Sequence, residues 1–455
     1  MNMREDYDLI VIGGGPAGQA ACLALQGRLA RVAVIDEQSR PGGQILRQPP
    51  RAFTVSNWLA GGTYRKLKAQ LRAFEAMGGV DWLGGRSVLD VRAEGDGWRV
   101  LVSDGAQVAS LRTRRVLIAA GCYDMTTPMP GWTLPGVMSA GAVQAFVKSQ
   151  RLTPGRGIVL AGSHPLQLLV AEQIIEAGGE VAALAFAQSL QSALVQAARR
   201  PMTVLAHAPQ LLKVLLGGLR LAASGCRIRF GDRPVEVVGE EQVQALRLAS
   251  GAQIDCDAVA LCFGFLPQSD LVRGMGLNVL QGRFGGWSAV HDPWMRSSRS
   301  GIYVAGETTG VKGAEAAGAE GALAGLAIAL DEGLITSVEA ERRARGPRRR
   351  RGRAMRFAEL LDAIADPSVF LSQAQPADTI LCRCEDVTQG AVDAAVATVE
   401  TPNAVKLSTR CGMGPCQGRN CEHLLLQRMN SVEKAPQGFR ARFPARPVRI
   451  GDLTA

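Results

Sequence analysis

The sequence lacks several patterns that would assign it to common protein classes. Its ten cysteines include no C-x-x-C pair, so we expect no dithiol of the disulfide-reductase type. No uncharged apolar run approaches the ~18 residues of a membrane span. The first predicted strand begins almost at the N-terminus, so we expect no signal peptide and a cytoplasmic protein. RNP-type signatures and zinc-finger spacings are absent, which argues against nucleic-acid binding.

Aromatic residues are also scarce, at 5%, whereas glycine is abundant, with 53 residues. This combination suits α/β domains with glycine-rich phosphate loops. A hydrophobic content of 47% with 20% charged residues is typical of a globular chain. A length of 455 residues predicts about three domains.

The net charge of +10 comes mostly from one segment. Between Val338 and Arg356 the chain holds nine Arg and two Glu, a local charge of +7, which leaves +3 for the rest. We interpret this segment as a solvated helix or linker. Contact with an acidic membrane surface, as a peripheral attachment to the cytoplasmic membrane face, or with a partner subunit is the weaker alternative.

The N-terminus carries a dinucleotide-binding pattern. Residues 7–12 form an apolar β-branched run, Gly13 to Gly18 a glycine loop, and an Ala-rich helix is expected as far as Gln26. A second strand, residues 31–36, ends in an acid. A glycine loop alone is weak evidence, but with every neighbour in place it predicts a pyrophosphate site; a glycine-rich turn in an unrelated α/β protein is the alternative.

Each residue of this pattern has an expected role. Gly13 allows the tight turn, Gly15 lets a pyrophosphate approach the backbone, and Gly18 lets the helix pack on the strand. The free N–H groups at the helix N-terminus attract the phosphates. The acid is expected at the ribose hydroxyls. The predicted cofactor-binding residues here are Gly13, Gly15, Pro16, Ala17, Gly18, Asp36 and Glu37.

Three further segments point to FAD. Residues 40–44, Arg-Pro-Gly-Gly-Gln, resemble the flavin-side loop of thioredoxin-reductase-like enzymes, with a plain turn as the alternative. The strand at 116–121 ends in Ala-x-Gly, and the strand at 301–307 ends in Gly-Glu, which resembles the second FAD motif of that superfamily with Glu in place of the usual Asp. The predicted FAD residues here are Gly43, Gln44, Ala120, Gly121, Gly306 and Glu307.

A second dinucleotide-type unit starts near Arg156, but its loop has lost its glycines. His164 stands where the second Gly belongs and Gln167 where the third would be. A Cβ at the second position blocks the close approach of a pyrophosphate. We therefore expect this domain to keep its fold and to have lost efficient NAD(P)H binding.

We predict an α/β fold with two Rossmann-like domains of the two-dinucleotide flavoprotein type and a small helical C-terminal iron–sulfur domain. The predicted segments are residues 1–150 and 285–335 as the two parts of the FAD domain, with a β-meander at about 80–111; 151–284 as the second dinucleotide-type domain; 336–376 as the Arg-rich helix or linker; and 377–455 as the iron–sulfur domain with a C-terminal tail.

Five cysteines lie in the last fifth of the chain, in a C-x-C pair followed by a glycine-rich loop. Four cysteine thiolates suit a 2Fe-2S cluster or zinc. Beside a flavin domain a one-electron carrier has a use, so iron–sulfur is favoured over a zinc knuckle or free thiols. The candidate ligands, five for four positions, are Cys382, Cys384, Cys411, Cys416 and Cys421. We interpret the other five cysteines as buried small hydrophobes.

With these residues in hand, the chain resembles the large FAD-containing subunit of the hydrogen cyanide synthase, opine oxidase and D-hydroxyproline dehydrogenase family over nearly its whole length. Its C-terminal module resembles bacterioferritin-associated ferredoxin. The segments that carry the resemblance are Gly13 to Gly18, Pro130 to Val137, Ala305 to Gly310, Cys382 to Thr388 and Gly412 to Gly418.

The resemblance implies a hetero-oligomer. A glycine- or sarcosine-oxidase-like flavoprotein subunit, joined by a small ferredoxin-like partner, would oxidise the C–N bond of an amino-acid-like small molecule. The chain would accept electrons through FAD and a 2Fe-2S cluster and pass them on. It also implies Cys382, Cys384, Cys416 and Cys421 as ligands, because the position of Cys411 varies in the related modules.

Two other functions remain open from the sequence. One is a self-contained NAD(P)H-dependent flavin and iron–sulfur oxidoreductase, which His164 disfavours. The other is a non-enzymatic iron–sulfur sensor on a relict flavin fold, which the intact loop at Gly13 to Gly18 disfavours. The sequence identifies no catalytic acid–base pair for amine oxidation, which fits an electron-transfer role.

Overall fold

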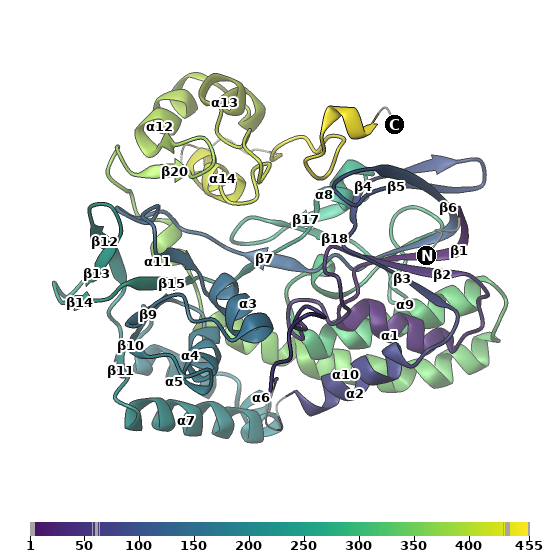
Figure 1. Cartoon of the computed structure of the whole chain (residues 1–455), viewed down its shortest axis with the longest axis horizontal. Coiled ribbons are helices and arrows are strands. Elements are labelled where there is room, and N and C mark those ends of the chain that lie inside the picture. The colour runs from purple at the N-terminus through teal and green to yellow at the C-terminus, as the bar shows by residue number, and fades with distance from the viewer. Residues whose placement is uncertain are drawn as a thin grey trace.

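The computed structural model describes residues 5–430 apart from 57, 60, 61 and 63, together with residue 432 and residues 437–453. The structure contains two α/β units that lie side by side, each a sheet with its covering helices, and we call them the first and the second layer. A small helical module lies above them in Figure 1. This architecture confirms the predicted fold class of two Rossmann-like domains with a small helical C-terminal domain.

The first layer is built on a seven-stranded sheet in the order β3-β2-β1-β6-β5-β4, with β19 paired to β6. The central parts of its parallel strands are apolar and buried, as is typical of a sheet that helices cover, and they include residues 9–12, 32–35 and 116–118. The bounds are β1 Asp6–Ile12, β2 Val32–Asp36, β3 Val80–Gly84, β4 Ser87–Glu94, β5 Gly97–Ser103, β6 Val108–Ile118 and β19 Ile302–Val304, with the helices α1 Pro16–Leu25, α2 Arg65–Glu75 and α9 Ala314–Asp331.

The strands of the β-meander predicted as an insertion in the FAD domain, at about 80–111, belong to the main sheet of this domain. β3 pairs parallel with β2, whereas β4 and β5 extend the sheet in antiparallel pairs beyond β6. The end of the predicted meander and the strand expected at 116–121 belong to one strand, β6, along which Arg112 and Arg114 are exposed while Leu111 and Thr113 are buried. This alternation is the period of two that a strand requires.

Helix α9 packs on α1 with almost no side chain between the two backbones. A Cβ on Gly321 would lie 2.0 Å from the carbonyl oxygen of Ala17, and a Cβ on Gly325 would lie 2.4 Å from that of Ala21. Gly321 and Gly325 are therefore needed for the packing of the two helices. Their close approach holds the start of α9 beside the start of α1.

The second layer is a five-stranded parallel sheet in the order β11-β10-β9-β15-β8. A three-stranded sheet, β12-β13-β14, adjoins it. The bounds are β8 Val137–Ser139, β9 Ile158–Gly162, β10 Val181–Phe186, β11 Arg227–Phe230, β12 Pro234–Gly239, β13 Val243–Leu248, β14 Gln253–Asp255 and β15 Ala258–Cys262, with the helices α3 Ala140–Gln150, α4 Leu166–Glu176, α5 Leu190–Ala198, α6 Pro201–Ala206 and α7 Ala208–Ala223.

The borders of this layer differ from the predicted range of 151–284. β8 pairs with β15, so the layer begins near Val137. It ends at β15, because α8 (Asp270–Gly274) packs on β4 and Val272 lies in the core of the first layer. The sequence motifs locate the nucleotide-binding loops but not the ends of the unit. Strand and helix packing place β8 in the second layer and α8 in the first.

Two short antiparallel strands join the layers. β7 (Cys122–Asp124) leaves the first sheet, and β16 (Phe265–Pro267) returns the chain to it. The segment that follows carries a two-stranded hairpin and a short 3₁₀ helix before α9, which are β17 Val279–Gln281, β18 Trp287–Ala289 and η1 Gly306–Thr309.

The Arg-rich segment forms α10 (Ser337–Ile364), a helix of 28 residues that packs against α9, α5 and α6. Ala340, Ala344 and Ala354 are buried on its inner face. Arg343 donates a hydrogen bond of 2.7 Å to the carbonyl of Ala24 in the first layer, and Arg353 donates one to a carbonyl of the second layer. The segment is thus a helix whose outer side is solvated, with Arg342, Arg345 and Arg349 among its exposed residues. It is not a linker, because its inner face packs across both layers (Figure 1).

The C-terminal module has its own small core. Its elements are β20 Ile380–Cys382, β21 Val387–Thr388, α12 Gln389–Thr398, α13 Pro402–Thr409 and α14 Glu422–Asn430, joined to α10 through α11 (Ser368–Leu371). A tail then returns to the first layer and ends in η2 (Ile450–Leu453). Among the helices of the described residues, none is both long and apolar enough to cross a membrane.

We predict opposite effects of alanine at two glycines of α9. Gly321→Ala places a methyl group against the backbone of α1 and should lower the free energy of unfolding by about 1–3 kcal/mol. At Gly318 the nearest atom to an added Cβ, the side-chain oxygen of Gln70, is 3.5 Å away, so Gly318→Ala should be neutral or stabilising by up to about 1 kcal/mol. Urea unfolding of both variants measures this. Equal effects at the two positions would contradict the proposed helix contact.

Candidate functional site

A cavity of about 690 Å³ opens at the carboxyl ends of β1 and β2. Residues from the first layer, the second layer and α10 line it. All the predicted FAD residues except Gly18 are among them, namely Gly13, Gly15, Pro16, Ala17, Asp36, Glu37, Gly43, Gln44, Ala120, Gly121, Gly306 and Glu307. The fold thus brings together motifs that are almost 300 residues apart in the sequence.

The glycine loop has the geometry that a phosphate site needs. A Cβ on Gly13 would lie 2.2 Å from the carbonyl oxygen of Ala119, and one on Gly18 would lie 2.1 Å from that of Gly13. Around Gly15, by contrast, an added Cβ would meet only the Cα of Gly43, at 3.7 Å. Gly15 is the N-cap of α1 and has no side chain to cap it, so the N-terminus of α1 faces the cavity. Such a helix end binds anions.

The acid at the end of β2 has a structural task. Asp36 accepts backbone N–H bonds from Gly14 at 2.6 Å and from Gln38 at 2.7 Å, one on each oxygen. Burial raises the pKa of Asp36, although these two bonds oppose that rise. Asp36 therefore braces the glycine loop. The neighbouring Glu37 also lines the cavity, and the role of either acid at a ribose stays a prediction.

The Pro-Gly-Gly loop packs directly on the glycine loop. Gly42 donates its N–H to the carbonyl of Gly14 at 3.0 Å, and a Cβ on Gly43 would lie 2.8 Å from the Cα of Gly15. Lys148 of α3 holds the far side, because its Nζ donates to the carbonyls of Gln44 and Ile45 at 3.3 and 3.1 Å. Burial lowers the pKa of Lys148 to about 7.

The Gly-Glu motif lies on the opposite side of the cavity. The Sγ of Cys122 donates a hydrogen bond of 2.7 Å to the carboxylate of Glu307. Burial raises the pKa of both groups. Cys122 is thus a half-buried residue of the cavity, whereas the sequence suggested only a buried small hydrophobe.

Glu320 of α9 organises the loop around that motif. Its side chain is 1% exposed and accepts hydrogen bonds from the N–H of Gly306 at 3.0 Å and from Arg351 of α10 at 2.8 Å. Lys312 lies 3.4 Å away. These cations lower the pKa of Glu320 against the effect of burial. The Arg-rich helix is therefore tied to the cavity by an ion pair.

The loop of the second layer faces the same cavity. Gly162, at φ +146°, keeps the turn after β9, and His164 follows it. The His164 ring lies edge-on to Phe265, 5.4 Å between ring centres, and its Nδ1 accepts the N–H of Leu166 at 3.1 Å. Burial lowers the pKa of His164 to about 4, so the ring is neutral. An imidazole ring thus fills the place of the missing glycine.

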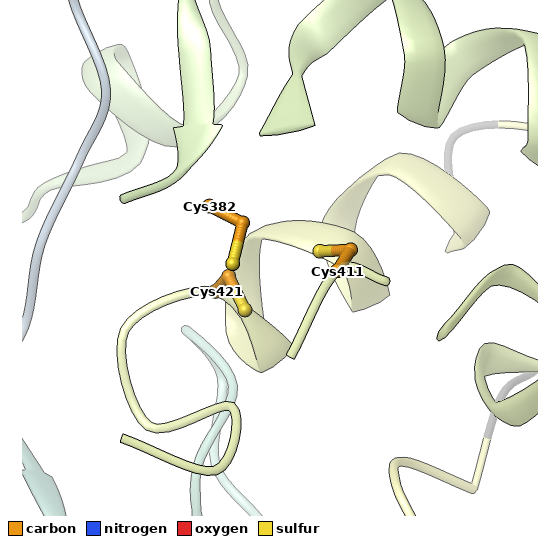
Figure 2. A group of neighbouring side chains, drawn as sticks. All are labelled: Cys382, Cys411 and Cys421. Carbon is orange, nitrogen blue, oxygen red and sulfur yellow. The ribbon is translucent and has the colours of Figure 1, made fainter. Parts of the chain in front are cut away.

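The five cysteines of the C-terminal module form two neighbouring groups. Figure 2 shows Cys382, Cys411 and Cys421, whose Sγ atoms all lie within 4.8 Å of one another. All three are buried, whereas Cys384 is exposed and hydrogen bonds with the half-buried Cys416. Soft thiolates are the ligands that iron–sulfur clusters require. The module brings five cysteines together, whereas a cluster of this type takes four thiolates. The choice of Cys382, Cys384, Cys416 and Cys421 as ligands therefore stays a prediction.

The module docks beside the strand that leaves the cavity. Thr126, just after β7, donates its hydroxyl to the carbonyl of Asn420 at 2.8 Å, and its own carbonyl accepts a bond of 2.7 Å from His423. Burial lowers the pKa of His423 to about 4, so its ring is neutral and donates through Nε2. Asn420 immediately precedes Cys421. The cysteine loop is therefore fixed to the β7 segment.

Charged pairs connect the same loop to the cavity. Asp270 accepts hydrogen bonds from Arg419, at 2.9 Å, and from Arg446 of the C-terminal tail, at 3.1 Å. Arg446 also pairs with Glu37 at 2.6 Å and lines the cavity. The contacts of Lys148, Glu320 and Arg446 around the cavity are not predictable from the sequence, because no local pattern distinguishes these residues from other charged ones.

Comparisons with known proteins identify both parts. Residues 7–321 match the profile of the pyridine nucleotide-disulphide oxidoreductase family, and residues 380–428 match that of the BFD-like [2Fe-2S] binding domain. The chain is 34% identical to an opine oxidase subunit of Rhizobium meliloti, over 99% of this chain and 88% of that one. It is 31% identical to hydrogen cyanide synthase subunit HcnB of Pseudomonas protegens, over 96% of both.

Solved structures share the fold. An L-proline dehydrogenase from P. horikoshii superposes with a TM-score of 0.68 at 22% identity, over 98% of this chain and 79% of that one. A thioredoxin reductase from T. acidophilum superposes with a TM-score of 0.52 at 17% identity, over 72% of this chain and 99% of that one. The first likeness therefore extends over nearly the whole chain, and the second over about three quarters of it.

We predict that Gly15→Ala abolishes flavin binding and leaves the fold intact. The added methyl group meets no backbone clash and points at the space that a pyrophosphate would occupy. The purified variant should lose most of its visible flavin absorbance, while the melting temperature of cofactor-free protein stays unchanged. Gly78→Ala, where an added Cβ meets no atom within 4 Å, is the control. Full flavin retention by Gly15→Ala would show that the site is misplaced.

We predict that serine at Cys382, Cys384, Cys416 or Cys421 bleaches the cluster or changes its reduced EPR signal, because a cluster iron loses a thiolate. Cys411→Ser should leave both nearly unchanged, with Cys411→Ala as a second variant for this buried position. Cys256→Ser, outside the module, is the control. Loss of the cluster in both Cys411 variants, with Cys421→Ser unaffected, would assign Cys411 as a ligand instead.

Proposed function

We propose a function for this chain from the family to which it belongs, the pyridine nucleotide-disulphide oxidoreductases, and from its branch with the opine oxidase and hydrogen cyanide synthase subunits just described. The chain would be the electron-transferring subunit of a hetero-oligomeric dehydrogenase or oxidase. It is a flavin-dependent oxidoreductase with an FAD-binding fold and a 2Fe-2S-binding domain. The complex would oxidise the C–N bond of an amino acid, imino acid or opine.

The observation that carries the proposal is the path between the two sites. Gly121 and Cys122 line the cavity, and Thr126 contacts the loop that ends at Cys421. Cys122 and Thr126 are four positions apart in the chain, which corresponds to about 13 Å when the chain is extended. A continuous backbone segment therefore connects the flavin cavity to the cysteine module. This arrangement suits transfer of electrons from one to the other.

The residues of the cavity fit a flavin dinucleotide. The N-terminus of α1 would hold the pyrophosphate, and Gly15 would allow its close approach. Asp36 would bind the ribose hydroxyls, because each of its oxygens accepts one backbone N–H and keeps a further acceptor site, and Glu37 lies beside it in the cavity wall. Glu307, held by Cys122, would accept hydrogen bonds from the ribityl or phosphate region.

The cysteine loop fits a 2Fe-2S cluster. When bound, the flavin accepts electrons in pairs and the cluster passes them on singly. Cys382, Cys384, Cys416 and Cys421 would supply the four thiolates, two for each iron. The two hydrogen-bonded groups of thiols support a two-iron arrangement, with Cys411 as a buried neighbour.

Substrate oxidation is assigned to a partner. The related chains are named as subunits of opine oxidase and of hydrogen cyanide synthase. Of the titratable side chains that line the cavity, Glu307 is engaged by Cys122, and the neutral His164 accepts a backbone N–H. The substrate would therefore bind to a glycine- or sarcosine-oxidase-like flavoprotein subunit, and a small ferredoxin-like protein would be a further member of the complex.

We predict that the isolated chain does not reduce an artificial dye with amino acids, imino acids or opines, and that the chain co-expressed with its flavoprotein partner does. The reason is that the chain would receive electrons from the partner rather than from the substrate. Dye reduction is measured for each substrate class, with the partner alone as control. Robust substrate-dependent reduction by the isolated chain would refute this division of labour.

A second candidate function is a stand-alone NAD(P)H-dependent oxidoreductase. The intact second sheet and the turn at Gly162 favour it, since they preserve the nucleotide-binding architecture. His164 opposes it, because the ring packs against Phe265 where a pyrophosphate would need open backbone.

We predict that NADH and NADPH reduce the bound flavin slowly. His164→Gly alone need not restore reduction, because other contacts of the loop differ as well. Stopped-flow absorbance after mixing with either nucleotide measures the rate, with dithionite as the control for full reduction. Rapid bleaching of the wild-type flavin would favour the stand-alone oxidoreductase.

A further inference from the structure

The C-terminal tail, residues 437–453, runs from the cysteine module back to the first layer (Figure 1). Ala445 donates its N–H to the carbonyl of Leu89 on β4 at 2.8 Å, and Arg449 donates to a carbonyl in the loop after β5 at 3.0 Å. Between these two anchors lies Arg446, whose side chain is 23% exposed. Of the described tail residues, Arg446 is the one that lines the flavin cavity. The tail therefore contributes one guanidinium to that site.

Arg446 enters the cavity at the end of β2. Its Nε donates a hydrogen bond of 2.6 Å to Glu37, the residue that follows Asp36. The N-terminus of α1 at Gly15 would hold the pyrophosphate, and Glu307 lies toward the ribityl side, so the end of β2 is left for the adenosine half of FAD. The tail therefore reaches the nucleoside end of the cofactor site.

The guanidinium of Arg446 keeps donor capacity for a ligand. Nε donates to Glu37, and Nη1 donates to Asp270 at 3.1 Å and to the carbonyl of Ala445 at 3.4 Å. Within the described part of the chain, Nη2 has no hydrogen-bond partner. Because the guanidinium is planar, fixing two of its nitrogens also fixes the direction of the third. The ribose oxygens and ring nitrogens of adenosine accept hydrogen bonds, so they suit this donor.

Attachment of the tail is the competing explanation for these contacts. The tail is already attached at this point without Arg446, because Arg419 donates both to Asp270 at 2.9 Å and to the carbonyl of Ala445 at 3.2 Å. The ion pair between Arg446 and the half-exposed Glu37 adds little to stability by itself, since pairs near the surface are worth about 0–1 kcal/mol. The reach of Arg446 into the cavity is therefore better explained by a ligand.

We propose that Arg446 is an FAD-binding residue that donates a hydrogen bond to the adenosine half of the cofactor. Glu37 and Asp270 position its guanidinium from two sides. Because Arg419 shares Asp270 and lies two positions before Cys421, a tail held by the cofactor also holds the cysteine loop. FAD binding and docking of the tail therefore favour each other, as linked equilibria must. The inference rests on the placing of FAD in this cavity and not on the source of the electrons.

Titration of the flavin-free full chain tests the contact. Arg446→Gln should raise the Kd for FAD about tenfold, because a hydrogen bond from a charged donor is lost. The Kd for ADP, which contains only the adenosine half, should rise by the same factor. Arg449→Gln is the matched control, because its guanidinium pairs with Asp452 in the same tail and outside the cavity. Each variant loses an ion pair, so the melting temperature of the flavin-free chain should change equally in both, and only Arg446→Gln should weaken nucleotide binding.

Limited digestion with trypsin tests the coupling between the cofactor and the tail. Added FAD or ADP should slow cleavage of the wild-type tail several-fold, followed by mass spectrometry, because a bound nucleotide holds the tail in place. The same nucleotides should protect the tail of Arg446→Gln much less. The cleavage sites to follow are two exposed arginines that both variants retain, Arg440 and Arg442.

Three results would overturn the proposal: equal Kd values for FAD in the wild type and Arg446→Gln, a weaker Kd for FAD with an unchanged Kd for ADP, and tail cleavage that neither nucleotide slows. Gly15→Ala separates these results from failure of the cofactor site itself. If Gly15→Ala retains its flavin, the site is misplaced and the role of Arg446 falls with it. If Gly15→Ala loses its flavin while Arg446→Gln binds FAD normally, only the role of the tail is refuted.

Discussion

The close contact between α1 and α9 is the constraint on which the cavity depends. Gly321 and Gly325 bring the two backbones together, so the Gly306–Glu307 turn lies opposite the glycine loop at Gly15. Larger residues would push α9 away and separate the two halves of the flavin site. Glu320, on the same helix, then holds the turn through the N–H of Gly306 and connects it to Arg351.

The second feature of the architecture is the route between the layers and the module. β7 leaves the cavity, pairs with β16, and continues to Thr126, which contacts the residue before Cys421. Asp270 joins Arg419 of the cysteine loop to Arg446 of the tail, and Arg446 reaches Glu37 at the cavity. The cysteine module is therefore fixed to the flavin cavity through both a strand and a chain of ion pairs.

The second layer keeps its sheet while its loop has changed role. His164 packs against Phe265 in the place of a glycine, so the turn after β9 forms part of the cavity wall. The outer helices α5 to α7 expose aliphatic side chains on the side remote from the module. The inner side of this layer therefore lines the flavin cavity, whereas its outer helices are exposed to solvent.

The sequence by itself determined the fold class, the FAD and 2Fe-2S domains and the family, because glycine and cysteine spacings are local features with specific backbone and ligand requirements. Only the tertiary structure decided the layer borders, since β8 joins the second sheet by pairing with β15. It also decided that Asp36 braces the loop, that Cys411 lies beside Cys382 and Cys421, and that one face of α10 packs on both layers. These outcomes depend on contacts between residues distant in the chain, which no local spacing encodes.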